Sequence, residues 1–334
     1  MRFHLMYLSV AVVVVSLLAC SGQEVQTPDA ALARIRPAAP GLTPSPYVPV
    51  YWQNSLFVID DISGFDVKRF ADGTWVSGGA FQAVNYPQAE WSDQKFFYLA
   101  NYHQGGGTTI DQYRPNYPTP NYPNPTPVLT YTTPAGQYAP TAITSQQLGN
   151  THYLFVTGIG GGTGWVDEYQ RDTNAIIATC NPGYFPVGIA VDPNGNVFVA
   201  YNDTNFNGHI EEYVGGLSGC NPMQLPMTFA GRVGGMVFDH AGRLLLCHSW
   251  SNVVDVIPPP YTSIFGTFGS GFSHPLHISI NLSNTLAFVV DTTAGPADKV
   301  DVFQYPSGTL IHTLGSADGL TDPDSAVDWQ NYGF

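Results

Sequence analysis

The chain has 334 residues, among them 35 Gly, 27 Pro, 19 Phe, 19 Tyr and 6 Trp. Only 11% are Asp, Glu, Lys or Arg, against about 25% in an average soluble domain, which argues against a helical bundle or coiled coil. The hydrophobic share of 44% argues against a disordered chain. The 11 basic and 25 acidic residues give a net charge of -14, which repels phosphate backbones, so we expect no nucleic-acid partner. The composition favours an all-β protein at or beyond the cell surface.

Residues 1–19 are predicted to be a signal peptide. Arg2 is followed by an apolar stretch from Leu5 to Leu18, which is shorter than the roughly 20 residues of a transmembrane helix. The stretch ends in Leu-Ala-Cys20, which resembles a bacterial lipobox, so Cys20 is the predicted lipidation site. In the enterobacterial sorting pattern, Ser21 after this cysteine implies the outer membrane. We therefore expect a lipid-anchored, periplasmic or surface-facing protein whose first partner is the bacterial membrane. The alternative is an ordinary secretory signal.

Residues 20–50 are predicted to be a flexible tether. They contain six prolines and show no strand alternation. A Pro-rich segment stays extended at about 3 Å per residue, so this one could hold a domain tens of ångströms from a membrane.

From residue 51 to 334 the chain repeats a unit of about 45 residues. The clearest copy, residues 186–213, has a hydrophobic strand, a Pro-Asn-Gly-Asn turn, a second strand, a polar loop and a third alternating strand. One acid recurs in every third strand, at spacings of 44 to 56 residues: Asp66, Asp111, Asp167, Glu211, Asp255 and Asp301. Six such four-stranded units predict a six-bladed β-propeller. Alternation along these strands favours a structural role for the six acids.

The first copy lacks its leading strand, and residues 323–329 can supply it. Such pairing of the two chain ends would close the ring and leave no open sheet edge. The alternative is a seven-bladed ring with one degenerate copy.

The units resemble NHL-repeat and SMP-30/lactonase-like propellers, with residues 186–213 the nearest match. The resemblance implies the fold for residues 51–334, but that fold is shared by enzymes and binding proteins. Lactonase-type members hold a metal through acids and amides at the second position of innermost strands. Asp324 is the one acid at these positions, since the others are Gln88, Thr141, Val187, Gly234 and Leu276, so the lactonase metal site is not supported.

In a propeller, the starts of the innermost strands and the ends of the second strands share one face. We predict that this rim is formed by Asp60, Gln88, Glu90, Asn101, Thr141, Gly158, Tyr201, His248, His274, His277, Asp291 and Asp324. The catalytic candidates among them are His248, His277, Asp291 and Asp324. The same four residues and Asp60 are the candidate metal ligands. Imidazoles and carboxylates so placed could bind a divalent metal or act as general acid and base. The alternative is a polar channel mouth lined with water.

Residues 113–127 form an insertion rich in Tyr-Pro steps, which favour an extended conformation. Its rings could contact a partner protein or glycan, or pack over their own blade.

Cys180 and Cys220 precede Asn-Pro in neighbouring copies, and equivalent positions of two blades lie too far apart for a disulfide. We therefore expect no bridge unless a loop departs from the repeat. Cys247 is expected to be a buried free thiol.

The sequence thus predicts a lipid-anchored, extracytoplasmic β-propeller that acts as a binding or scaffold module for a protein or glycan. The alternative is a metal-assisted hydrolase or lyase with its site at the channel mouth. No cofactor is predicted apart from a possible divalent metal.

Overall fold

The computed structural model describes residues 55–60, 66–71, 74–75, 81–82, 86–93, 95–102, 108–113, 127–160, 162–293 and 298–329. The predicted signal peptide, Cys20, the tether and most of the Tyr-Pro insertion lie outside these residues. No helix within the described ranges is long and apolar enough to cross a membrane.

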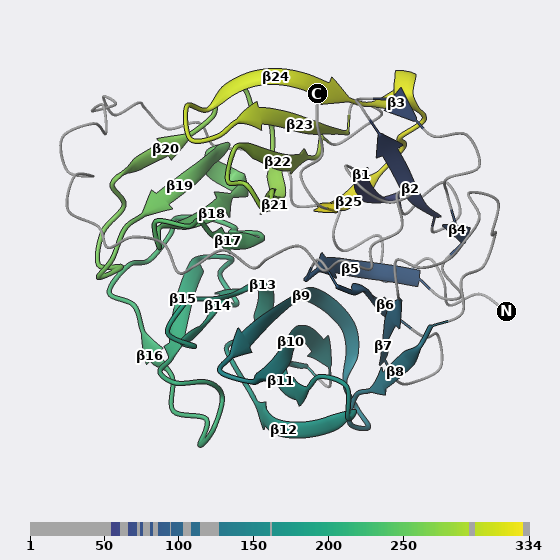
Figure 1. The fold of residues 1–334 in the computed structure, drawn as a ribbon. Helices are drawn as coiled ribbons and strands as arrows, with labels where there is room; N and C mark the ends of the chain where they lie inside the picture. Colours follow the sequence, from purple (N-terminus) through teal and green to yellow (C-terminus); the bar gives the residue numbers. More distant parts are fainter. Residues whose placement is uncertain are drawn as a thin grey trace, which may run out of the picture.

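The described chain forms six antiparallel sheets arranged as the blades of a β-propeller (Figure 1). Blade 1 contains β25 (Pro323–Trp329), β1 (Ser55–Asp60), β2 (Asp66–Ala71), β3 (Thr74–Trp75) and β4 (Phe81–Gln82), the last two both pairing with β2. Blade 2 contains β5 (Tyr86–Ser92), β6 (Phe97–Tyr102), β7 (Thr108–Tyr113) and β8 (Leu129–Thr132). Blade 3 contains β9 (Tyr138–Leu148), β10 (Thr151–Gly160), β11 (Thr163–Gln170) and β12 (Ala175–Cys180).

Blades 4 to 6 follow the same order from the innermost to the outermost strand. Blade 4 contains β13 (Phe185–Val191), β14 (Val197–Asn202), β15 (Gly208–Tyr213) and β16 (Met223–Gln224). Blade 5 contains β17 (Met236–Phe238), β18 (Leu244–His248), β19 (Val253–Ile257) and β20 (Gly266–Phe268). Blade 6 contains β21 (Pro275–Ile280), β22 (Leu286–Asp291), β23 (Lys299–Gln304) and β24 (Thr309–Leu314). Two short 3-10 helices, η2 (Ser249–Ser251) and η3 (Ser316–Asp318), lie in connecting segments.

The C-terminal strand closes the ring, as predicted. β25 pairs antiparallel with β1, so that Ser55 lies opposite Trp329 and Val58 opposite Ala326 (Figure 1). The innermost strands β5, β9, β13, β17, β21 and β25 contact one another in order, and β25 contacts both β21 and β5. The alternative of a seventh blade is therefore wrong.

The two ends of the propeller are built differently. We call the end with the starts of the innermost strands and the ends of the second strands the mouth face, and the opposite end the base face. On the base face, an Asx-type turn closes the hairpin between the first two strands of blades 2, 4, 5 and 6. In blade 4, the Asp192 carboxylate accepts the backbone N–H groups of Asn194 and Asn196 at 2.9 and 2.8 Å, and Asp93, Asp239 and Asn281 repeat the arrangement. These local bonds explain why the Pro-Asn-Gly-Asn pattern predicted the hairpin.

The recurring acids of the third strands have the structural role that alternation predicted. Three of them accept a hydrogen bond from a threonine opposite on the fourth strand, at 2.6 to 2.8 Å: Asp111 from Thr130, Asp167 from Thr179 and Asp301 from Thr313. A tyrosine two residues further donates to Asp111, Asp167 and Glu211. Burial raises the pKa of Asp167 and of Glu211, while these hydrogen bonds oppose that rise.

The hydrophobic core lies between the blades rather than at the centre of the ring. Each apolar cluster combines side chains from two neighbouring blades, for example Phe198 of blade 4 with Leu244 of blade 5. The cluster that joins blade 6 to blade 1 includes Phe288, Leu56 and Ala326. The two faces of a β-strand in the middle of a blade pack against different clusters, so both faces are apolar. This explains why the sequences of the second strands are almost entirely hydrophobic.

The expectation of unpaired cysteines is wrong for one pair. Cys180 and Cys220 form a disulfide with their Cα atoms 5.4 Å apart. Cys180 ends β12 of blade 3, whereas Cys220 precedes the outer strand of blade 4 in the loop after β15. That loop lies against blade 3, because the Leu217 N–H donates to Glu168 at 2.9 Å. The two cysteines are therefore not equivalent positions, and the distance expected from ring symmetry does not apply. Cys247 is a buried free thiol, as predicted.

Candidate functional site

The mouth face contains most of the rim residues in the predicted arrangement. Asp60, Asn101, Tyr201 and Asp291 lie at or next to the ends of second strands. Each lies opposite a proline at or next to the start of the innermost strand of the same blade. Glu90 is an exception, because it lies opposite Leu99 in the interior of β6 rather than at a strand end, and its side chain is buried. The prediction that Glu90 lines the rim is therefore wrong.

Asp60 and Asp291 hold the segments that lead into the innermost strands. Both are fully buried. Asp291 accepts the backbone N–H groups of Ser273 and His274 at 2.8 and 2.7 Å, and Lys299 Nζ lies 3.5 Å from it. In the next blade, Asp60 accepts the N–H of Asp322 at 2.7 Å. The two carboxylates thus play the same role in adjacent blades, just before Pro275 and Pro323.

His248 has both ring nitrogens in contact with other groups of the protein. Nδ1 lies 3.1 Å from the Asp255 carboxylate and Nε2 lies 3.1 Å from the carbonyl oxygen of Ala230. The ring also stands edge-on to Phe229, with the ring centroids 5.5 Å apart. His248 therefore positions the connection between blades 4 and 5.

His277 and Asp324 lie near the starts of the innermost strands of blades 6 and 1. Nδ1 of His277 is buried and has no hydrogen-bond partner. Burial lowers the pKa of His277 to about 4, so the imidazole is neutral at neutral pH. The ring lies close to the backbone of blade 5, since a Cβ on Gly235 would be 3.1 Å from its Cδ2. Asp324 is partly buried.

Among the described residues, no three His, Cys, Asp or Glu side chains are grouped in a way that could hold a metal ion. The metal or catalytic role of His248, His277, Asp60, Asp291 and Asp324 stays a prediction.

The mouth face also exposes large apolar side chains that the sequence analysis did not single out. Tyr184 and Phe185 at the start of blade 4 are 51% and 38% exposed, and Trp250 in η2 is 44% exposed. Tyr138 and Leu276 are exposed at the starts of β9 and β21. Their positions beside strand ends were visible in the sequence, but their exposure depends on how the connecting segments fold.

Arg232 lies among these side chains, in the connection from blade 4 to blade 5. Its Cζ is 4.4 Å from the ring centroid of Phe206 and 6.0 Å from that of Trp250. The two rings are 6.0 Å apart and tilted by 33°. A guanidinium over aromatic faces is a cation–π arrangement. Partial burial lowers the pKa of Arg232, although an arginine stays charged in proteins. We call Phe206, Arg232 and Trp250 the mouth triad.

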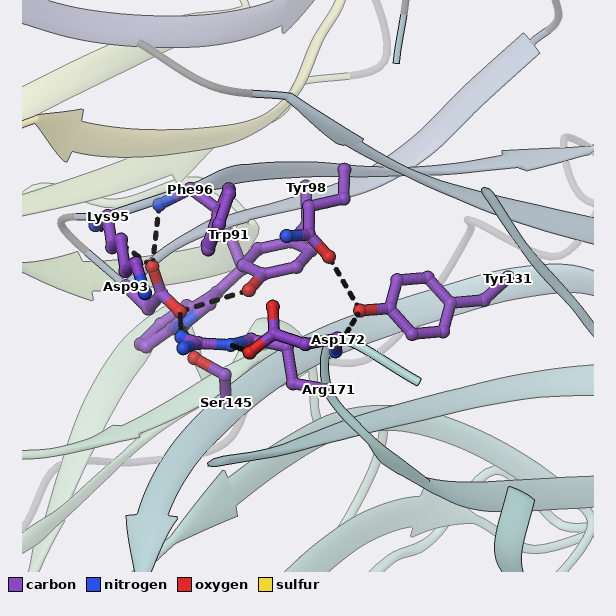
Figure 2. Close-up of polar contacts among 10 residues, drawn as sticks. Trp91, Asp93, Lys95, Phe96, Tyr98, Tyr131, Ser145, Arg171 and Asp172 are labelled. Atoms are coloured by element: carbon purple, nitrogen blue, oxygen red, sulfur yellow. Dashed lines mark hydrogen bonds and ion pairs between the residues drawn. The ribbon is translucent and has the colours of Figure 1, made fainter. Parts of the chain in front are cut away.

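A second polar cluster connects blades 2 and 3 (Figure 2). The Arg171 guanidinium lies 2.5 Å from the Asp93 carboxylate, which also accepts the Tyr98 hydroxyl hydrogen bond at 3.0 Å. Asp172 N–H donates to Tyr131 Oη at 3.3 Å. Burial raises the pKa of Tyr131 to about 12. Since Arg171 is almost fully buried and paired, this cluster joins two blades rather than offering free groups to a ligand.

Neither a protein-family model nor a curated protein matches this chain. Solved structures share its fold. A chain of a nidogen/laminin complex aligns with a TM-score of 0.60 and 15% identity, covering 83% of this chain and 99% of that one. A protein of unknown function from Bacteroides caccae has a TM-score of 0.58 and 10% identity, with coverages of 81% and 97%. A functionally unknown protein from Desulfotomaculum acetoxidans DSM 771 has a TM-score of 0.52 and 14% identity, with coverages of 79% and 80%.

At these identities the likeness establishes the fold alone. The chain is a six-bladed β-propeller closed by its C-terminal strand.

Proposed function

We propose that the protein is an extracytoplasmic binding module that captures a partner on its mouth face and is held at the bacterial outer membrane by lipidated Cys20. The observation that carries the binding role is the contrast between two sets of mouth residues. The buried groups Asp60, Asp291 and His248 contact the protein's own connecting segments. The aromatic side chains, by contrast, are exposed to solvent. Exposed aromatic residues beside an arginine are typical of protein interfaces.

The fold is compatible with this role. The similar chain from the nidogen/laminin complex belongs to an assembly of proteins. The disulfide between Cys180 and Cys220 supports an extracytoplasmic location, because disulfides persist in oxidising compartments and are rare in the cytosol.

The path of the chain suits an N-terminal anchor. β1 is a second strand, so it begins at the base face with Ser55 and ends at the mouth face with Asp60. The described chain therefore begins on the side opposite the mouth. A tether attached there would direct the mouth face away from the membrane and toward partners.

Site-specific photo-crosslinking from the mouth face tests the binding role. A photoreactive amino acid is placed at Tyr184 or Trp250 in the full chain, and a matched control is placed at Leu310, an exposed apolar residue on the outer strand of blade 6. We expect a crosslinked partner from the two mouth positions and none from position 310. Equal products from all three positions, or none from the mouth, would overturn the proposal.

The anchor has its own test. Mass spectrometry of the mature protein should find lipid on Cys20, and Cys20→Ser should move the protein from the membrane fraction to the soluble fraction. A soluble, unmodified wild-type protein would contradict the anchor but not the binding role.

The hydrolase or lyase hypothesis has one structural feature in its favour, the unpartnered Nδ1 of His277. Metal analysis of the purified protein tests it. A stoichiometric divalent ion that is lost on His277→Ala would favour the enzyme over the binding module.

A further inference from the structure

Arg232 differs from three other cations of this acidic chain. The chain has 25 acidic and only 11 basic residues, so carboxylates are in excess. Arg171, Arg243 and Lys299 each form an ion pair with an aspartate. In the described part of the chain, Arg232 has no carboxylate within ion-pair distance, and its side chain contacts the rings of Phe206 and Trp250. A guanidinium kept free of the surrounding acids is available to an external anion.

The segment that carries Arg232 is fixed on both sides. The Gly208 N–H donates to the carbonyl oxygens of Phe229 and Gly231 at 2.9 and 3.0 Å. Asn202 accepts the N–H of Val233 at 2.9 Å and donates its amide to the Val233 carbonyl at 3.1 Å.

Close packing against the tryptophan adds to this constraint. Gly231 has a φ of +96°, and a Cβ there would lie 2.7 Å from Trp250 Cβ. Together with the contact of His248 with Ala230, these interactions hold the segment before any partner arrives. A group that is already held in position pays less conformational entropy when it binds.

From this geometry we propose that the mouth triad binds a carboxylate of a protein partner, with an apolar side chain of that partner packing on Trp250. This proposal deepens the binding function proposed above and rests on it. The planar guanidinium fork matches a carboxylate with two parallel hydrogen bonds, and within the described residues Arg232 has cation–π contacts but no ion pair that would compete for its N–H groups. The carboxylate belongs to an Asp, a Glu or a chain terminus.

A protein is favoured over an acidic glycan by the surroundings of the triad. Exposed apolar side chains on the same face include the aliphatic Leu276 as well as Tyr184 and Phe185. An apolar surface around a Trp and an Arg is the composition of a protein-interface hot spot.

Selection from a random peptide display library on the mature chain tests the proposal. We expect the selected peptides to contain an acidic residue next to an apolar one. Synthetic versions are then compared with variants in which the acid is changed to its amide. The Asp-to-Asn or Glu-to-Gln change in the peptide, and Arg232→Gln in the protein, should each weaken binding about 10- to 100-fold. The two changes together should cost little more than either alone, because both remove the same contact. Arg232→Lys should retain part of the affinity, since lysine keeps the charge but loses the planar fork.

Lys95→Gln is the matched control, because it removes one exposed positive charge near the hairpin that follows β5 on the base face. It should leave peptide binding unchanged. Thermal unfolding of each variant verifies that the propeller is intact.

The outcomes separate the two proposals. The carboxylate inference would be overturned by a partner that crosslinks at the mouth face but binds Arg232→Gln as tightly as wild type, or by selected peptides that lack acidic residues. Either result would leave the proposed binding function unaffected. Binding only to uronate-containing glycans on an array would overturn the choice of a protein. If neither peptides nor the photo-crosslinks reveal a partner at the mouth, both proposals fail.

Discussion

At the scale of single residues, the carboxylates at the mouth face act mainly on their own backbone. Asp291 and Asp60 each accept N–H groups from the segment entering an innermost strand. A hydrogen bond to a charged acceptor contributes more than a neutral one, and a buried N–H left without an acceptor is costly. These aspartates therefore determine how the connections of blades 6 and 1 are placed at the mouth.

Asp291→Asn tests this role. The amide offers one acceptor oxygen in place of two and loses the attraction to Lys299. We expect a loss of about 2 kcal/mol in the free energy of unfolding, measured by urea denaturation. Asp172→Asn is the control, because the Asp172 side chain is about half exposed, so solvent screens its ion pair with Arg171. Equal stability of the two variants would contradict a structural role for Asp291.

At the scale of elements, the loop from β15 to β16 departs from the repeat. It folds back onto blade 3, where Leu217 joins the apolar cluster between blades 3 and 4 and Cys220 bonds to Cys180. The blade 3–blade 4 boundary is thus held by a covalent bond across 40 residues of chain. A disulfide of this span restricts the unfolded chain and stabilises the fold.

Replacement of both cysteines by serine should lower the free energy of unfolding by roughly 2–4 kcal/mol. The measurement is chemical denaturation of the protein purified from an oxidising compartment, with and without a reducing agent. Reduction should destabilise the wild type and leave the double variant unchanged. Cys247→Ala is the control that removes a thiol but no bridge. If alkylation labels Cys180 and Cys220 in the native protein, the bridge is absent and the prediction fails.

At the scale of the whole molecule, the ring depends on the seam where β25 meets β5. Glu90 of β5 lies buried at this seam, beside Ser325 and the backbone of Ile59, and neither carboxyl oxygen has a well-formed hydrogen bond. Burial raises the pKa of Glu90 well above its ordinary value of 4.5. The folded protein therefore keeps this proton at pH values at which the unfolded chain has lost it.

The sign of the pH dependence follows from linkage. A carboxyl whose folded pKa is raised contributes stability at low pH, and this contribution is lost as the pH rises above the ordinary value of 4.5 toward the raised one. Glu90→Gln resembles the neutral acid, so it should be more stable than wild type at neutral pH, and the difference should vanish near the ordinary pKa. Thermal unfolding across the pH range measures this. Glu212→Gln, at a partly exposed acid, should have a smaller effect. A wild type as stable at neutral pH as Glu90→Gln would contradict the prediction.

The architecture could be predicted from the sequence because it depends on local periodicity. The acid of each third strand marks every blade, the turn after the first strand marks four of them, and the lack of a leading strand before β1 indicates the closure. The disulfide could not be predicted, because the path of the loop that carries Cys220 depends on packing against another blade. Glu90 occupies the strand position that the buried Ile189 and Ile278 occupy in blades 4 and 6, so its burial follows from the repeat. The mouth triad joins three separate connections, so no single stretch of sequence reveals it.

The position of β1 within blade 1 determines how the protein would carry mechanical load. β1 is paired along all six of its residues with β2 on one side and with β25 on the other. If a partner pulls on the mouth while an N-terminal tether holds the base, the force acts along β1. The hydrogen bonds on both of its edges then share the load in shear instead of breaking one after another. The strand that completes the ring would therefore also strengthen the connection of the propeller to such a tether.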